Sequence, residues 1–189
     1  MRLLLILSIL QSLFTAVETK PLEADINLTV TEQRAQPFSY NGHGVVYGKR
    51  FLAALMGYEL AYDGRTMYVW AEDTDELTLT TPSEQELLEV NPFLFAREVY
   101  KVSRETKKVA ADGRTAVITL TPAEQTATQR QTTRVVVRVS REGNDWLPTD
   151  IELHEGTKVT KLSFSHVRWA DTDIVFVLDH PSAFLNDLR

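Results

Sequence analysis

Residues 22–31, LEADINLTVT, alternate apolar and polar side chains without interruption. A period of two residues is typical of a β-strand that turns one face to a core and the other to solvent. Segments rich in β-branched and aromatic residues, separated by turn residues, follow through most of the chain. The sequence therefore predicts a mainly β protein, and residues 22–31 are its clearest strand.

Further strands are expected at residues 37–47, 51–56, 58–62, 66–72, 76–80, 107–111, 115–121, 132–140, 149–155 and 158–169. Asp63 and Gly64 mark the clearest hairpin turn, because both tolerate the positive φ of tight turns. Another turn is expected at residues 122–130. A sheet of about ten antiparallel strands with so little helix has to curl into a barrel or half-barrel around its helices.

A helical segment interrupts the strands at residues 81–96, TPSEQELLEVNPFLFA. Thr81 is the expected N-cap and Pro82 the first helical residue, with Glu84 near the positive end of the helix. A second short helix is expected to start at residues 91–92 and to run to residue 96.

The first twenty residues have two interpretations. A charged start and an apolar core at residues 1–10 resemble a secretory signal, although Phe14 is bulky for the position three residues before a cleavage site. The apolar spacing from Leu3 to Val17 alternatively predicts an amphipathic helix that Pro21 ends. We expect residues 1–20 to be a signal-like or amphipathic N-terminal helix and residues 21–189 to be a single domain.

Composition excludes several classes of protein. The 189 residues include no cysteine, so disulfide scaffolds, thiolate zinc sites and thiol nucleophiles are excluded. A formal net charge of −6 at pH 7 makes nucleic acid and anionic membranes poor partners. The longest apolar run, residues 3–10, is too short to span a bilayer.

Catalytic motifs are absent from the sequence. The four histidines are isolated along the chain, and no HExxH, GxSxG or phosphate-binding glycine loop occurs. His154 is expected on the polar face of its strand beside Glu152, and His166 on the same face as Phe164. Acidic residues gather at residues 73–76 and on the helix at residues 84–89, where a turn and a solvated face explain them. We expect no enzymatic activity.

Several predicted strands carry apolar residues on both faces. Met67 and Val69 point one way, whereas Tyr68 and Trp70 point the other. Such strands need cover on two sides, and the helices are the expected cover of the concave face. A curled sheet with loosely packed helices can hold an apolar cavity in place of a solid core.

Four short motifs resemble one protein family. DGRTMYVW at residues 63–70 resembles the DGKTLWVY hairpin of LolA, the periplasmic lipoprotein carrier family, and especially of its branch in Bacteroidota. Residues 81–92 resemble the helical segment of that branch, residues 22–26 its first strand, and DLR at residues 187–189 its usual end. The resemblance extends from about residue 9 to the end of the chain.

The resemblance implies an unclosed antiparallel β-barrel with helices covering a concave hydrophobic face. It also implies a carrier that accepts triacylated lipoproteins from an inner-membrane ABC transporter and takes them through the periplasm to an outer-membrane acceptor, which stays unknown. An acyl chain needs shelter, because each methylene exposed to water costs about 0.8 kcal/mol. A binding protein for another lipid or glycolipid is the alternative, and a hydrolase with paired carboxylates is a third possibility.

The expected cavity lining comes from the helices and the strands. It consists of Leu13, Phe14, Val17, Phe51, Leu55, Tyr68, Trp70, Leu87, Leu88, Phe93 and Phe95. Arg50 matches a basic position that the resembled family uses during cargo transfer. We expect a monomer that needs no metal and no cofactor.

Overall fold

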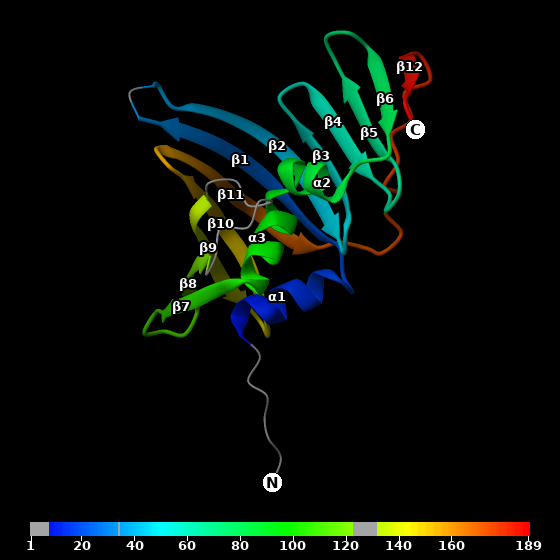
Figure 1. The fold of residues 1–189 in the computed structure, drawn as a ribbon. Coiled ribbons are helices and arrows are strands. Elements are labelled where there is room, and N and C mark those ends of the chain that lie inside the picture. The colour runs from blue at the N-terminus through cyan, green and yellow to red at the C-terminus, as the bar shows by residue number, and fades with distance from the viewer. Residues whose placement is uncertain (1–7, 34, 123–131) are drawn as a thin grey trace.

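A computed structural model of the chain describes residues 8–33, 35–122 and 132–189, and it contains one curled β-sheet with helices on its concave side (Figure 1). The helices are α1 (Ile9–Val17), α2 (Glu84–Val90) and α3 (Pro92–Lys101). The strands are β1 (Leu22–Glu32), β2 (Phe38–Tyr47), β3 (Arg50–Leu55), β4 (Tyr58–Tyr62), β5 (Met67–Ala71), β6 (Glu76–Thr80), β7 (Ser103–Val109), β8 (Thr115–Pro122), β9 (Thr132–Glu142), β10 (Asp145–Glu155), β11 (Lys158–Trp169) and β12 (Phe184–Asp187).

The strand order explains why helices cross the sheet. The twelve described strands follow the order β12-β6-β5-β4-β3-β2-β1-β11-β10-β9-β8-β7, and β12 and β7 at its two ends do not pair with each other. Because β6 and β7 lie near opposite ends, the chain between them has to cross the sheet, and α2 and α3 form this crossing on the concave face (Figure 1). The predicted fold class, an unclosed antiparallel sheet with short helices, is confirmed. One strand, β12, runs parallel to its neighbour β6.

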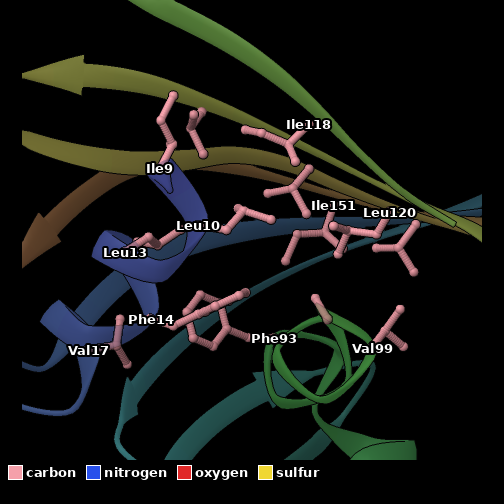
Figure 2. Packing of buried hydrophobic residues seen from close by; sticks show 14 of the residues in the cluster. Ile9, Leu10, Leu13, Phe14, Val17, Phe93, Val99, Ile118, Leu120 and Ile151 are labelled. Carbon is pink, nitrogen blue, oxygen red and sulfur yellow. The ribbon is translucent and has the colours of Figure 1, made fainter. Parts of the chain in front are cut away.

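Helix α1 belongs to the hydrophobic core. Leu10, Leu13 and Val17 are at most 1% exposed and pack against α3 and the strands β8 to β10 (Figure 2). The rings of Phe14 on α1 and Phe93 on α3 meet edge to face with 5.4 Å between their centroids. Residues 9–17 therefore form a packed amphipathic helix, while residues 1–7 of the signal-like segment lie outside the described residues.

Several element boundaries differ from the prediction. Helix α3 continues to Lys101, β7 begins at Ser103, and β10 begins at Asp145, ahead of the expected start at residue 149. The pairing of β9 and β10 shifts between Pro148 and Asp150, and such an irregularity tolerates a residue without an N–H. Of the turn expected at residues 122–130, residues 123–130 lie outside the described residues.

The start of α2 corrects the predicted N-cap. The N-cap is Ser83, whose Oγ accepts a hydrogen bond from the backbone N–H of Glu86, while the Glu86 carboxylate accepts one from the backbone N–H of Ser83. This reciprocal capping box satisfies two free N–H groups, which Thr81 two residues earlier does not do. Hydrogen bonds that the backbone N–H and the hydroxyl of Ser83 donate to the Glu86 carboxylate hold the pKa of this carboxyl below its ordinary value.

Replacing Ser83 with alanine is expected to lower the free energy of unfolding by about 1 kcal/mol, because one partner of the capping box is lost. Urea denaturation followed by circular dichroism measures the change. Thr81→Ala is the matched control, since Thr81 is exposed and precedes the helix. Equal losses for the two variants would contradict the assignment of Ser83 as the cap.

A bulge in β11 reverses the expected direction of His166. The pairing of β1 with β11 shifts between Glu23 and Asp25, and His166 has a φ of 51°. The extra residue changes the alternation of side chains, so that His166 lies on the convex face beside Asp25 while Phe164 lies on the concave face. The prediction that His166 and Phe164 share a face is therefore wrong.

Candidate functional site

An apolar groove of about 260 Å³ lies between the concave face of the sheet and the junction of α2 and α3. Strand β1 contributes alternate residues to its floor, namely Leu22, Ala24, Ile26 and Leu28. The intervening residues Glu23, Asp25, Asn27 and Thr29 face the other side of the sheet. The alternation recognised in the sequence thus produces one apolar wall of the groove.

Two glycines of β2 keep this floor flat. Gly42 and Gly44 lie opposite Ile26 and Ala24 of β1. A Cβ atom on Gly44 would lie 2.8 Å from Cδ1 of Ile26, and one on Gly42 would lie 2.8 Å from Cδ1 of Leu55. The side chains of Ile26 and Leu55 therefore lie over backbone, which leaves room for the groove above them.

The roof comes from the end of α2 and the start of α3. Leu88 and Phe93 face the groove from this junction, and Asn91 lies between them. Asn91 is buried and caps α3, because its Oδ1 accepts hydrogen bonds from the backbone N–H groups of Phe93 and Leu94 at 3.1 Å. The cap fixes the direction in which α3 leaves α2 and so places Phe93 over the sheet.

Four of the predicted lining residues, Phe51, Leu55, Leu88 and Phe93, line the groove. Leu13, Phe14 and Val17 lie in the solid core under α1 and are not part of the groove lining. Leu87 packs with Phe51, Tyr62 and Met67 in a smaller cluster. Phe95 is also buried in the main core and lines a second cavity between α2 and α3.

Tyr68 and Trp70 lie on the opposite face of the sheet, which corrects their expected position in the cavity. The Trp70 ring stacks on the ring of His180, with 4.1 Å between centroids and 3° between planes. Its Nε1 donates a hydrogen bond to Asp75 at 3.0 Å. The segment after β11, which carries His180, therefore supplies the second cover of these strands that the helices were expected to supply.

Arg50 also lies away from the groove. Its guanidinium carbon is 4.5 Å from the centroid of the Tyr47 ring and 5.0 Å from that of Phe176. Because Phe51 faces the groove, its neighbour Arg50 faces the convex side, where cation–π contacts hold it. A role for Arg50 in cargo transfer stays a prediction, and neither aromatic partner of its guanidinium belongs to the groove lining.

The second cavity, of about 250 Å³, lies beside contacts that hold α1 and α3 on the sheet. Arg97 of α3 lines it and forms an ion pair with Glu18, the residue that caps α1. The backbone N–H of Gly48, in the turn between β2 and β3, donates to the carbonyl of Val17 at 2.9 Å. These contacts join α1, α3 and the sheet, and the sequence pattern did not indicate them because they link residues far apart in the chain.

Histidines and carboxylates meet on the convex face. His43 Nδ1 and His166 Nδ1 lie 3.0 and 2.7 Å from the two carboxylate oxygens of Asp25. These hydrogen bonds hold the pKa of Asp25 below its ordinary value, and a hydrogen bond from Arg168 does the same for the pKa of Glu23. Nε2 of His154 lies 3.4 Å from Oε2 of Glu152. The two side chains share a face of β10, as the strand pattern predicts.

The described part of the chain contains neither a candidate metal site nor a candidate membrane-spanning helix. Within residues 8–33, 35–122 and 132–189, no group of histidine and acidic side chains has an arrangement that suits a metal ion. Over the same ranges, no helix has both the length and the apolar character needed to cross a membrane.

Comparison with known proteins gives similarity in structure alone. No protein-family model and no curated protein matches the chain. An uncharacterized conserved protein from Thermus thermophilus is similar over 92% of this chain and 94% of its own, with a TM-score of 0.59 and 8% identity. A LolA superfamily protein from Nitrosomonas europaea is similar over 90% of this chain and 98% of its own, with a TM-score of 0.49 and 12% identity. LprF from Mycobacterium bovis is similar over 90% of this chain and 94% of its own, with a TM-score of 0.47 and 13% identity.

At 8% identity, the similarity to the Thermus thermophilus protein shows a shared fold and says nothing about a ligand. The observed architecture, a sheet of twelve strands that does not close and carries helices on its concave face, is the one that the LolA resemblance implies. The chain thus has the unclosed curled-sheet fold that the resemblance predicts.

Proposed function

We propose that this protein is a non-enzymatic carrier that shelters the acyl chains of lipoproteins in the groove between the sheet and the helices α2 and α3. The observation that carries the proposal is the groove itself, whose floor and roof are formed mainly by aliphatic and aromatic side chains. Passage through the periplasm, from an inner-membrane transporter to the outer membrane, is proposed from the motif resemblance.

The energetics favour an acyl ligand. Each buried methylene contributes about 0.8 kcal/mol, so burial of a long acyl chain gains on the order of 10 kcal/mol, which offsets the cost of association. Within the lining, the polar side chains are those of Glu89, Asn91 and Thr160, and Asn91 already uses its side chain to cap α3. Recognition in this groove therefore depends on apolar area, which suits a carrier that accepts different proteins through the lipid that they share.

Helix α2 is the part of the roof best suited to move. It has seven residues, and one of them, Leu87, is buried. Short helices with few buried residues have little stability of their own, so displacement of α2 costs less than displacement of α1 or α3. Such a displacement would enlarge a groove whose volume lies near the lower end of the range for ligand pockets, about 300 Å³.

Native mass spectrometry with a synthetic triacylated lipopeptide tests the proposal. We expect a complex of one protein with one lipopeptide, and no complex with the same peptide without its acyl chains. Failure of the folded protein to bind the lipopeptide at any concentration would reject the carrier function. Binding of a lysophospholipid together with such a failure would favour the alternative, a binding protein for another lipid.

A further inference from the structure

The apolar face of β1 continues beyond the groove. Leu28 is the last residue of β1 in the groove lining, and Val30 follows on the same face. The pairing of β1 with β2 places Tyr40 directly opposite Leu28 and Phe38 opposite Val30. All four side chains therefore face the concave side, and we call Leu28, Val30, Phe38 and Tyr40 the hairpin strip.

The hairpin strip is open to solvent. Phe38 is 48% exposed and Tyr40 is 38% exposed, and their rings pack edge to face with 5.7 Å between centroids. Figure 1 shows the hairpin end of β1 and β2 extending away from α2 and α3. Exposed aromatic side chains that continue an apolar groove are typical of a binding surface.

The opposite face of the same hairpin is polar. Asn27 Nδ2 donates hydrogen bonds to Ser39 Oγ at 2.9 Å and to Asn41 Oδ1 at 2.8 Å, and Thr29 donates to Asn27 Oδ1 at 3.1 Å. Each strand thus sends its polar residues to the convex face and its apolar residues to the uncovered concave face. The apolar strip ends at Glu32 of β1 and Lys158 of β11, which pair in register at the hairpin end.

We propose that the hairpin strip binds the part of an acyl chain that leaves the groove, so that the chain lies along β1 and its head group emerges beside Glu32 and Lys158. The inference rests on the function proposed above. It adds the direction in which the acyl chain lies along β1 and the chemical class of the ligand. The ligand is a long-chain amphiphile with a head that stays outside the protein. From Ala24 to Val30, β1 offers an apolar path of about 20 Å.

The width of the strip favours a chain over a protein partner. A stable protein interface buries about 800 Å² on each partner and involves about 20 residues or more. The hairpin strip has four apolar side chains, and one of them, Leu28, already belongs to the groove lining. Continuity with the groove, which ends at Leu28, makes the emerging acyl chain the occupant that fits.

Isothermal titration calorimetry with saturated fatty acids from octanoate to stearate tests this path. For the wild-type protein, affinity is expected to rise about fourfold per methylene up to the longest acids. Replacing both aromatic residues, Phe38→Ser with Tyr40→Ser, is expected to leave octanoate binding unchanged and to weaken stearate binding about tenfold. Phe184→Ser is the control, because Phe184 is 72% exposed on β12, at an end of the sheet.

The outcomes separate this inference from the proposed function. Equal affinities of the double variant and the wild-type protein for every acid would overturn the inference and assign the strip to another occupant, such as a protein. Uniform weakening for all acids, octanoate included, would overturn it as well, because the strip would then act through the whole fold. If the wild-type protein binds no fatty acid and no lipopeptide, the proposed function fails and this inference fails with it.

Discussion

Replacing Leu10 with alanine is expected to lower the free energy of unfolding by about 2–5 kcal/mol. Leu10 has no exposed surface, and α1 places it in the cluster with Ile118 and Ile151 of the sheet (Figure 2). The variant loses the transfer free energy of the removed methyl and methylene groups and leaves a cavity that the surrounding strands cannot fill. Urea denaturation followed by tryptophan fluorescence measures the loss.

Gln11→Ala is the matched control on the same helix. Gln11 is exposed, and alanine has the higher helix propensity, so this variant is expected to be as stable as the wild-type protein or slightly more stable. If Leu10→Ala were no more destabilising than Gln11→Ala, α1 would not be docked in the core. The interpretation of residues 9–17 as part of the folded protein would then have to be abandoned.

Strand positions were predictable because burial of one face imposes a period of two. The alternation at residues 22–31 corresponds to β1, and the expected strand at residues 158–169 corresponds to β11 from its first residue to its last. Where a bulge interrupts the period of two, the alternation of apolar and polar residues no longer indicates which face is buried. At His166 one extra residue turns the following side chains over, and nothing in the local sequence distinguishes a bulge from regular alternation.

Strand β12 was not predicted for a related reason. It has four residues, too few to show a period, and it exists because β6 offers an edge to which the chain returns after β11. The backbone N–H of Phe184 donates to Asp75 and that of Leu188 donates to Leu79, both more than a hundred residues earlier in the chain. Such pairing depends on the tertiary fold and not on local propensity.

The groove was predictable only in part, because a strand that is apolar on both faces does not reveal which face lies inside. For β3, Phe51 and Leu55 share a face and both line the groove. For β5, the aromatic residues Tyr68 and Trp70 suggested the cavity, yet Met67 and Val69 face the concave side. The second apolar face of β5, which carries Trp70, is covered by the segment after β11, where His180 lies. The residues near β5 give no sign that this distant segment packs there.

Replacing Leu55 with glutamate is expected to weaken acyl-chain binding by roughly 30- to 700-fold, equivalent to about 2–4 kcal/mol. Leu55 is half-buried in the groove wall beside the backbone of Gly42, and it is the last residue of β3. In the empty groove a carboxylate at this position can reach water, so the variant is expected to fold. A bound chain would remove that water, and the cost of desolvating the charge would oppose binding.

The neighbouring residue provides the control that separates this effect from a change in net charge. Ala54 is exposed on the convex face of the same strand, where it pairs with His43 and Glu59, so Ala54→Glu adds the same charge outside the groove. We expect Ala54→Glu to bind stearate and the triacylated lipopeptide like the wild-type protein. Equal binding by all three proteins would show that the chain does not enter the groove, whereas equal loss in both variants would indicate long-range repulsion. Only a selective loss in Leu55→Glu places the acyl chain against the concave face of β3.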